Sequence, residues 1–158
     1  MLDSGAIELV GRYHLIAELL ADGIEVAMPI RDRGVDLIAY LETHKPTDHF
    51  YSLPIQLKVS SRRSFSLDKK YASIRGLLLV YAWGATGPET EREFYAMNYS
   101  QAKKLLDEMG HAATDSWTIK GRYVTSRPSE RLIKAMRRHK MTRGNWLKRI
   151  TNQSGEAK

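Results

Sequence analysis

The sequence contains no cysteine. Disulfide bonds and thiolate metal sites are therefore excluded. Long apolar runs are also missing, since no stretch approaches the roughly 20 apolar residues that a helix needs to cross a bilayer. The first residues, MLDSGAIEL, lack the basic and apolar regions of a signal peptide. These absences predict a cytoplasmic location and no membrane partner.

Several common catalytic motifs are absent as well. The glycines form no phosphate-binding loop of the GxxxxGK type, and the five histidines show no metal-ligand spacing such as HExxH. Internal repeats and low-complexity segments are also missing.

Charge is distributed very unevenly along the chain. Residues 1–60 carry 5 basic and 9 acidic side chains, net −4, and residues 61–110 carry 8 and 6, net +2. Residues 111–158 carry 12 and 3, net +9. A strongly basic end favours a polyanionic partner, most simply nucleic acid, over a merely solvated surface.

Hydrophobic spacing predicts alternating helices and strands. A helix is predicted over 6–22, with its apolar face formed by Leu9, Tyr13, Ile16, Ala17 and Leu20. Strands are predicted at 24–30, 35–42, 50–61, 76–84 and 92–98, and further helices at 99–110 and 127–141. Residues 43–49 are predicted as a loop, 62–73 as irregular with a short helix at 67–73, 117–125 as a strand or hairpin arm, and 142–150 as a last basic turn or helix.

This order predicts an α/β fold with a mixed central sheet flanked by helices. The core is expected at residues 1–110. A basic helical extension at 111–150 would pack on it, and 151–158 would form a flexible tail.

Gln56 and Lys58 stand out because they lie in an otherwise apolar strand, PIQLKVSS at 54–61. Alternate residues of a strand share a face, so both side chains project from the same side. Asp36 opens the preceding strand, directly after Gly34 and Val35. If these strands are antiparallel neighbours, Asp36 lies close to the face of Gln56 and Lys58.

A carboxylate, an amide oxygen and an ammonium group around one pocket suit phosphodiester hydrolysis. Asp36 would hold a hard divalent cation, Mg²⁺ or Mn²⁺, with the Gln56 oxygen as a neutral ligand. The cation would activate a bound water, and Lys58 would orient that water or stabilise the charged transition state. In the structural alternative, Lys58 extends to solvent and Gln56 makes a cross-strand hydrogen bond.

The segments GVDLIAY and PIQLKVS resemble the PD-(D/E)XK nuclease superfamily. Within it they are most similar to small bacterial proteins with an IQVK-type motif, which include a branch of group I intron homing endonucleases. The preceding segment, VGRYHLIAELLADGIEVAMP, and the helix-strand-strand-strand order are also similar. The resemblance covers residues 8–83.

The resemblance implies a restriction-endonuclease-like core of αβββαβ order and a Mg²⁺-dependent DNA endonuclease. Asp36 would be the principal metal ligand, Gln56 would stand at the D/E position, and Lys58 would be the catalytic lysine. The backbone carbonyl of Leu57 would be a further ligand, and Glu8 is preferred to Glu18 as the acid from the first helix. Two positions depart from the pattern: Gln56 removes a negative charge, and Val35 replaces the usual proline.

Basic residues at two places are predicted to contact phosphates. The first group follows the motif strand, and the second lies in the basic C-terminal segment. They are Arg62, Arg63, Lys69 and Lys70, and Arg131, Lys134, Arg138, Arg143 and Lys148.

Three functions are therefore compared. The first is an endonuclease acting on DNA, most simply duplex DNA. The second is a catalytically inactive nucleic-acid-binding protein on the same fold, and the third is an unrelated α/β protein. Cleavage of both DNA strands needs two active centres, so a homodimer is expected with the first.

Overall fold

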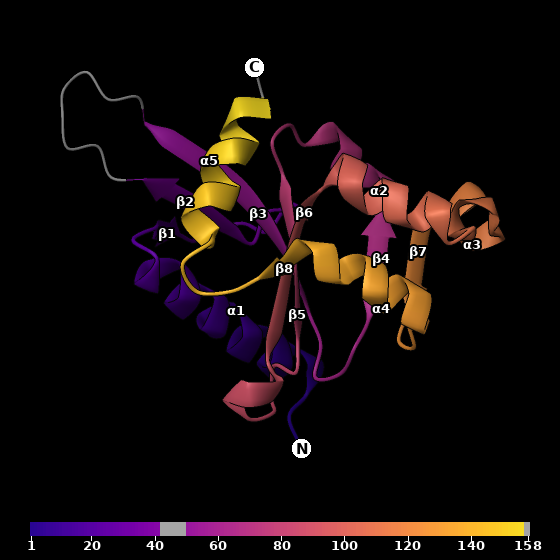
Figure 1. Cartoon of the computed structure of the whole chain (residues 1–158), viewed down its shortest axis with the longest axis horizontal. Coiled ribbons are helices and arrows are strands. Elements are labelled where there is room, and N and C mark those ends of the chain that lie inside the picture. Colours follow the sequence, from indigo (N-terminus) through magenta and orange to yellow (C-terminus); the bar gives the residue numbers. More distant parts are fainter. Residues whose placement is uncertain (42–49, 157–158) are drawn as a thin grey trace.

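A six-stranded mixed sheet forms the centre of the computed structural model, which describes residues 1–41 and 50–156 (Figure 1). Its strand order is β1-β2-β3-β5-β6-β8. These strands are β1 (Glu25–Ala27), β2 (Leu37–Leu41), β3 (Tyr51–Val59), β5 (Leu78–Trp83), β6 (Glu93–Asn98) and β8 (Lys140–Met141). The predicted α/β class with a mixed central sheet is confirmed.

The strands β3 and β5 form the parallel pair at the centre of this sheet. All other neighbouring strands are antiparallel. Every residue of β5, LLVYAW, is buried, as expected for a strand covered on both faces.

A second, two-stranded sheet and the helices cover the central sheet. The small sheet pairs β4 (Phe65–Asp68) with β7 (Arg122–Thr125). The helices are α1 (Ser4–Ala21), α2 (Tyr99–Glu108), α3 (Asp115–Thr118), α4 (Glu130–Met136) and α5 (Trp146–Glu156), and the 3₁₀ helices are η1 (Lys69–Ser73), η2 (Glu89–Glu91), η3 (His111–Ala113) and η4 (Arg137–His139).

Each face of the central sheet has its own hydrophobic core. On one face, which we call the α1/α5 face, Leu15 and Leu19 of α1 pack in the same cluster as Trp146 and Ile150 of α5. On the other, the α2/α4 face, the cluster contains residues of α2, α4 and the small sheet, including Leu105, Leu132 and Phe65. The sheet is therefore the middle layer of three.

The buried face of α1 differs from the predicted one. Gly11, Leu15 and Leu19 are buried, whereas Leu9 and Tyr13 are 47% and 56% exposed. The reason is the glycine: a Cβ atom on Gly11 would lie 2.4 Å from Cγ1 of Val59 in β3. A prediction based on large apolar side chains misses the buried face of α1, because that face is set by the close approach of the helix backbone to β3.

Other differences arise where pairing is non-local. Residues 65–68, expected to be irregular, form β4 because they pair with β7 far along the chain. The helix expected over 127–141 ends at Met136, and β8 then joins the sheet edge beside β6. Helix α5 continues to Glu156, into the segment expected to be a flexible tail. The loop predicted at 43–49 lies outside the described residues.

The chain after residue 110 contributes to both sheets, through β7 and β8. Asp22, at the end of α1, accepts hydrogen bonds from the backbone N–H groups of Gly144 and Trp146, at 2.7 Å and 3.1 Å. This carboxylate joins the end of α1 to the start of α5. Among the described residues, no helix is long and apolar enough to cross a membrane.

We expect Gly11→Ala to lower the free energy of unfolding by about 1–3 kcal/mol, because the new methyl group overpacks against Val59. The matched control is Gly5→Ala in the same helix, where the nearest heavy atom would be 3.4 Å away. Alanine favours helix, so this control should be neutral or stabilising. Urea unfolding measures both variants, and equal effects would contradict the proposed contact.

Candidate functional site

The loop before β2 positions Asp36. The pairing of β2 with β3 begins with Leu37 opposite Ile55, and the backbone N–H of Asp36 donates to Ile55 O at 2.8 Å. Gly34, with φ of +90°, makes the preceding turn. Asp32 supports this turn, since its Oδ1 accepts from the N–H of Gly34 at 3.0 Å.

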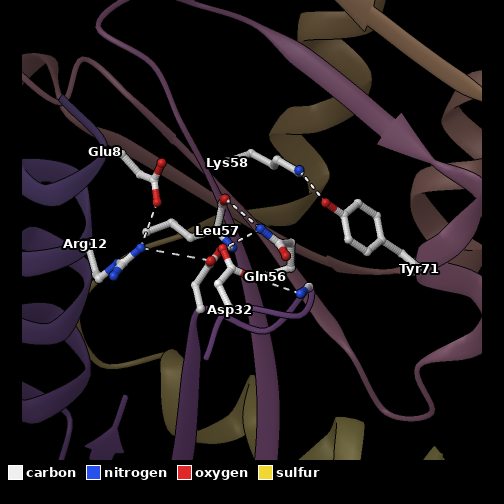
Figure 2. A network of polar contacts seen from close by, with 9 residues as sticks. Glu8, Arg12, Asp32, Gln56, Leu57, Lys58 and Tyr71 are labelled. Carbon is white, nitrogen blue, oxygen red and sulfur yellow. Dashed lines mark hydrogen bonds and ion pairs between the residues drawn. The ribbon is translucent and has the colours of Figure 1, made fainter. Parts of the chain in front are cut away.

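The structure brings Asp36, Gln56 and Leu57 into direct contact (Figure 2). Asp36 Oδ2 accepts hydrogen bonds from Gln56 Nε2 and from the backbone N–H of Leu57, both at 2.6 Å. Gln56 Nε2 also donates to the carbonyl oxygen of Leu57 at 3.3 Å. Asp36 is 6% exposed and Gln56 is 7% exposed, so this polar cluster is buried.

Burial raises the pKa of Asp36 above the ordinary value of an aspartate. The N–H of Leu57 and the Arg12 guanidinium favour the charged form, whereas Asp32 and Glu8 disfavour it. Desolvation is the largest of these effects. The negative charge of Asp36 is therefore only partly balanced by its neighbours, so an additional positive charge beside it would be favourable.

Helix α1 brings Arg12 and Glu8 toward the cluster, with Arg12 in contact with Glu8 and close to Asp36. Arg12 Nη2 donates to Glu8 Oε1 at 2.7 Å and lies 4.0 Å from Asp36 Oδ1. Glu8, the predicted third acid, is thus linked to Asp36 through Arg12. Figure 2 shows Glu8 and Arg12 facing each other. Glu18 lies 3.7 Å from Arg143, away from this cluster.

Lys58 lies on the same strand face as Gln56, where Tyr71 holds it. Lys58 Nζ donates to Tyr71 Oη at 2.6 Å and lies 4.7 Å from the centre of the same ring. Burial lowers the pKa of Lys58, with Asp36 acting in the opposite direction. Burial raises the pKa of Tyr71 to about 12. The phenol therefore stays neutral, and its oxygen can accept a hydrogen bond from the ammonium group of Lys58.

Three residues near this site were missed by the sequence prediction. Asp32 precedes Asp36 in the charged turn RDRG, so its proximity to the strand end was a usable signal. Tyr71 and Arg122 reach Lys58 from η1 and β7. No local pattern shows their proximity, because it depends on how the small sheet packs on the central one.

The predicted phosphate contacts that follow β3 lie in two places. Lys69 and Lys70 are exposed on η1, where their ammonium groups lie 5.2 Å from the ring centres of Trp117 and Tyr71 respectively. Lys70 is therefore a neighbour of Lys58. Arg62 and Arg63 instead line a separate cavity of about 390 Å³ at the end of β3.

The predicted C-terminal cations are spread over several elements. Arg131 and Lys134 are exposed on α4, and Lys148 is exposed on α5, which covers the other face of the sheet. Arg138 lies 3.9 Å from Glu108, and Arg143 lies near Glu18. Trp146, which lies among these charges in the sequence, is fully buried and belongs to the core.

The cluster at Asp36 contains oxygen atoms that could bind a cation, but Asp36 is its only acid among the described residues. Within residues 1–41 and 50–156, no group of three or more His, Asp or Glu side chains is placed to hold a metal ion. The available oxygens are the Asp36 carboxylate, the Leu57 carbonyl and the Gln56 amide. The side-chain N–H group of Gln56 lies between the Asp36 carboxylate and the Leu57 carbonyl, because Nε2 is within hydrogen-bond distance of both oxygens.

A half-turn of the Gln56 amide would exchange Nε2 for Oε1 in this position. Such terminal amide torsions are broad and roughly two-fold, and either end of the amide can face a partner of the right polarity. Carboxylate, carbonyl and amide oxygens are ligand types that a hard divalent cation such as Mg²⁺ prefers.

Comparison with known proteins does not assign the chain, because it matches no protein-family model and no curated protein. The resemblance to the PD-(D/E)XK superfamily therefore stays a prediction.

The raised pKa of Asp36 predicts a pH-dependent stability. The folded protein holds the Asp36 proton more tightly than the unfolded chain does, so stability is lost as pH rises through the raised pKa. Asp36→Asn removes the free-energy cost of keeping a charged carboxylate buried at high pH. We expect the variant to be more stable than wild type at pH 8 and to lose that advantage toward pH 4.

Urea unfolding between pH 4 and pH 8 measures this difference. Asp115→Asn, at an exposed position of α3, is the control, and the stability of Asp36→Asn is compared with that of this variant at each pH. An advantage of Asp36→Asn that stays constant over this range would contradict the assignment of the pKa to Asp36.

Proposed function

We propose that the protein hydrolyses phosphodiester bonds of DNA, most simply duplex DNA, with Mg²⁺ or Mn²⁺. The site would be of the PD-(D/E)XK type on a restriction-endonuclease-like core. One observation carries the proposal: Asp36, Gln56 and Leu57 meet at hydrogen-bond distance in a buried cluster, and Lys58 lies next to Gln56 on the same strand face.

The arrangement of elements supports this proposal. Helix α1 packs on β3 through Gly11, and β2 and β3 are antiparallel neighbours. The acid comes from the start of β2 and the amide and lysine come from β3. The order α1-β1-β2-β3 agrees with the order that the resemblance predicts.

Each residue would have a distinct part in the reaction. A bound divalent cation supplies a water of lowered pKa and balances charge on the phosphate. Asp36, Leu57 O and the turned Gln56 amide would hold that cation. Lys58 would stabilise the charge that develops on the phosphate oxygens.

Tyr71 is a positioning residue in this scheme, because it acts through Lys58. Its hydroxyl fixes the ammonium group at 2.6 Å, and its ring is itself buried, at 3% exposure. Restricting Lys58 in this way lowers the entropy that must be lost when a phosphate is bound.

Positive charge around Lys58 supports an anionic substrate. Lys70 and Arg122 are close enough to lower the pKa of Lys58, and Lys69 precedes Lys70 on η1. These residues come from β3, η1 and β7, so they form a cationic surface only in the folded protein, and Asp68 partly offsets their effect on Lys58. Phosphate contacts of this kind position a nucleic acid without reading its sequence.

One observation favours a second function, a catalytically inactive nucleic-acid-binding protein. The N–H group of Gln56 already satisfies Asp36, and Gln56 brings no charge to the site. A neutral amide in place of a carboxylate weakens cation binding. In that case the cationic surface would bind DNA without cutting it.

Nicking of supercoiled plasmid DNA tests the two functions. With Mg²⁺ or Mn²⁺, we expect wild type to nick the plasmid and EDTA to prevent it. Asp36→Asn and Lys58→Met should each reduce the rate at least about 100-fold, as expected when a group that stabilises transition-state charge is lost.

The control is Lys104→Met, which removes one exposed lysine on α2. It should nick as wild type does. Salt-dependent DNA binding without nicking would support the inactive binder instead. Absence of both binding and nicking would exclude both functions.

Cation binding can be tested apart from cleavage with Gln56→Glu. The new carboxylate replaces an N–H donor with an acceptor beside the buried Asp36, and the two like charges should repel. We expect lower stability than wild type at pH 8 without metal, and a thermal stabilisation by Mn²⁺ larger than that of wild type.

The same thermal shift in the Asp36→Asn, Gln56→Glu double variant provides the control. It should lose most of the stabilisation, because the principal ligand is gone. If Mn²⁺ stabilises the Gln56→Glu variant no more than wild type, the three oxygens do not form a cation site.

A further inference from the structure

Arg12 lies between two carboxylates at the edge of the candidate site. Its Nη2 donates to Glu8 Oε1 at 2.7 Å and lies 4.0 Å from Asp36 Oδ1. Figure 2 shows the guanidinium group between Glu8 and the cluster that contains Gln56 and Leu57. A single nitrogen atom is therefore within ion-pair distance of one acid from α1 and one acid from the turn before β2.

The two oxygens of Asp36 face different partners. Oδ2 accepts from Gln56 Nε2 and from the backbone N–H of Leu57, whereas Oδ1 lies toward Arg12. The Asp36 side chain is 3% exposed and is fixed by these contacts. The Glu8 side chain is 51% exposed, so it can change rotamer without disturbing the core. One acid is thus held in place, and the other can adjust to a cation that lies between them.

The stability of the fold does not account for this arrangement. Exposed i,i+4 ion pairs stabilise a helix only slightly. Arg12 Nε is buried, and it has no hydrogen-bond partner among the described residues. A buried N–H group without a partner costs more free energy than such an ion pair contributes. The position of the guanidinium group is therefore better explained by a role in the site.

Divalent cations take up the same kind of position. A hard cation binds carboxylates from separate elements through oxygen. In sites that hold two such ions about 3.5–4 Å apart, the ions together balance the charge on the attacking and leaving oxygens. One carboxylate can contact both ions at this spacing, one through each oxygen. In Asp36 the Oδ2 side is the position proposed above for a divalent cation, and the Oδ1 side faces Arg12.

We propose that the guanidinium group of Arg12 fills the place of a second divalent cation between Glu8 and Asp36. The site then takes no more than one divalent ion, and Arg12 supplies the other positive charge. A guanidinium group donates hydrogen bonds to phosphate oxygens, so it can balance charge on a phosphate as a second ion would. It cannot coordinate a water molecule, so activation of the nucleophile is left to the single ion.

The role of Arg12 in the reaction rests on the proposed function, because it requires that the protein cleaves DNA. The occupation of a cation position does not, because it follows from the contacts of Arg12 with Glu8 and Asp36. Cation binding and cleavage are therefore measured separately.

Counting bound Mn²⁺ tests the cation position. Free Mn²⁺ is measured by electron paramagnetic resonance at pH 8 in solutions of wild type and of Arg12→Gln. Each count is corrected with the same protein that also carries Asp36→Asn, so that only ions that need Asp36 are counted. We expect Arg12→Gln to bind one Mn²⁺ more than wild type, because the negative charges of Glu8 and Asp36 are then no longer balanced by the guanidinium group.

Three further variants provide the controls. Arg12→Lys keeps the positive charge and should bind as many ions as wild type. Arg12→Gln combined with Glu8→Gln loses the second carboxylate and should return to the wild-type count. Lys103→Gln removes one positive charge from the i,i+4 ion pair with Asp107 on α2, and it should leave the count unchanged.

The outcomes separate the cation position from the proposed function. One ion bound by wild type and two by Arg12→Gln supports both. No ion bound by wild type and one by Arg12→Gln supports the cation position of Arg12 and contradicts the divalent-cation site of the proposed nuclease. A count that does not rise in Arg12→Gln overturns the inference. So does a wild-type count of two, or an extra ion that persists without Glu8 or appears in Lys103→Gln.

The dependence of plasmid nicking on Mn²⁺ concentration tests the role of Arg12 in the reaction. At low Mn²⁺, Arg12→Gln should nick at least about tenfold more slowly than wild type, since a group that balances phosphate charge is lost. Higher Mn²⁺ should restore much of the rate, because a second ion replaces the guanidinium group. The rate of this variant should therefore rise more steeply with Mn²⁺ concentration than the wild-type rate does.

Equal steepness in the two proteins would overturn the role of Arg12 in cleavage. Absence of nicking by wild type would overturn this role together with the proposed function, while the ion count still decides the cation position.

Discussion

The buried carboxylate of Asp36 is the constraint on which the surrounding structure depends. A charge that is taken out of water needs partners within hydrogen-bond distance, and here they come from the next strand, through Gln56 and the N–H of Leu57. The register of β2 against β3 provides them, because Leu37 pairs with Ile55. A slip of one residue would turn Gln56 and Lys58 toward the α1/α5 face. Strand register, burial and site chemistry are thus set together.

Helix α1 links this constraint to the rest of the fold. The absence of a side chain at Gly11 lets the helix lie directly on Val59, two residues after Leu57 in β3. The close approach brings Arg12 to the edge of the polar cluster formed by Asp36, Gln56 and Leu57. At its other end the helix meets α5 through Asp22. The same helix therefore supports the candidate site and the C-terminal part of the core.

Much of the fold and the centre of the candidate site could be predicted from local pattern. The strand that contains Gln56 and Lys58 combines alternation with two unexpected polar residues, and Asp36 stands at a predicted strand start. The contact of Asp36 with Gln56 therefore followed from antiparallel pairing. Tyr71 could not be predicted in this way, because η1 reaches Lys58 only after β4 pairs with β7. The approach of Arg12 to Asp36 was missed for a similar reason, because it depends on how α1 packs on the central sheet.

The edges of the central sheet bear on how two copies of the protein could associate. The outermost strands are short: β1 spans three residues and β8 spans two. Such edges offer few unpaired N–H and C=O groups to a neighbouring strand, which disfavours continuous sheets between molecules. The helix surfaces are more extensive than these edges. They include the exposed apolar side chains of Leu9, Tyr13 and Leu20 on the outer side of α1.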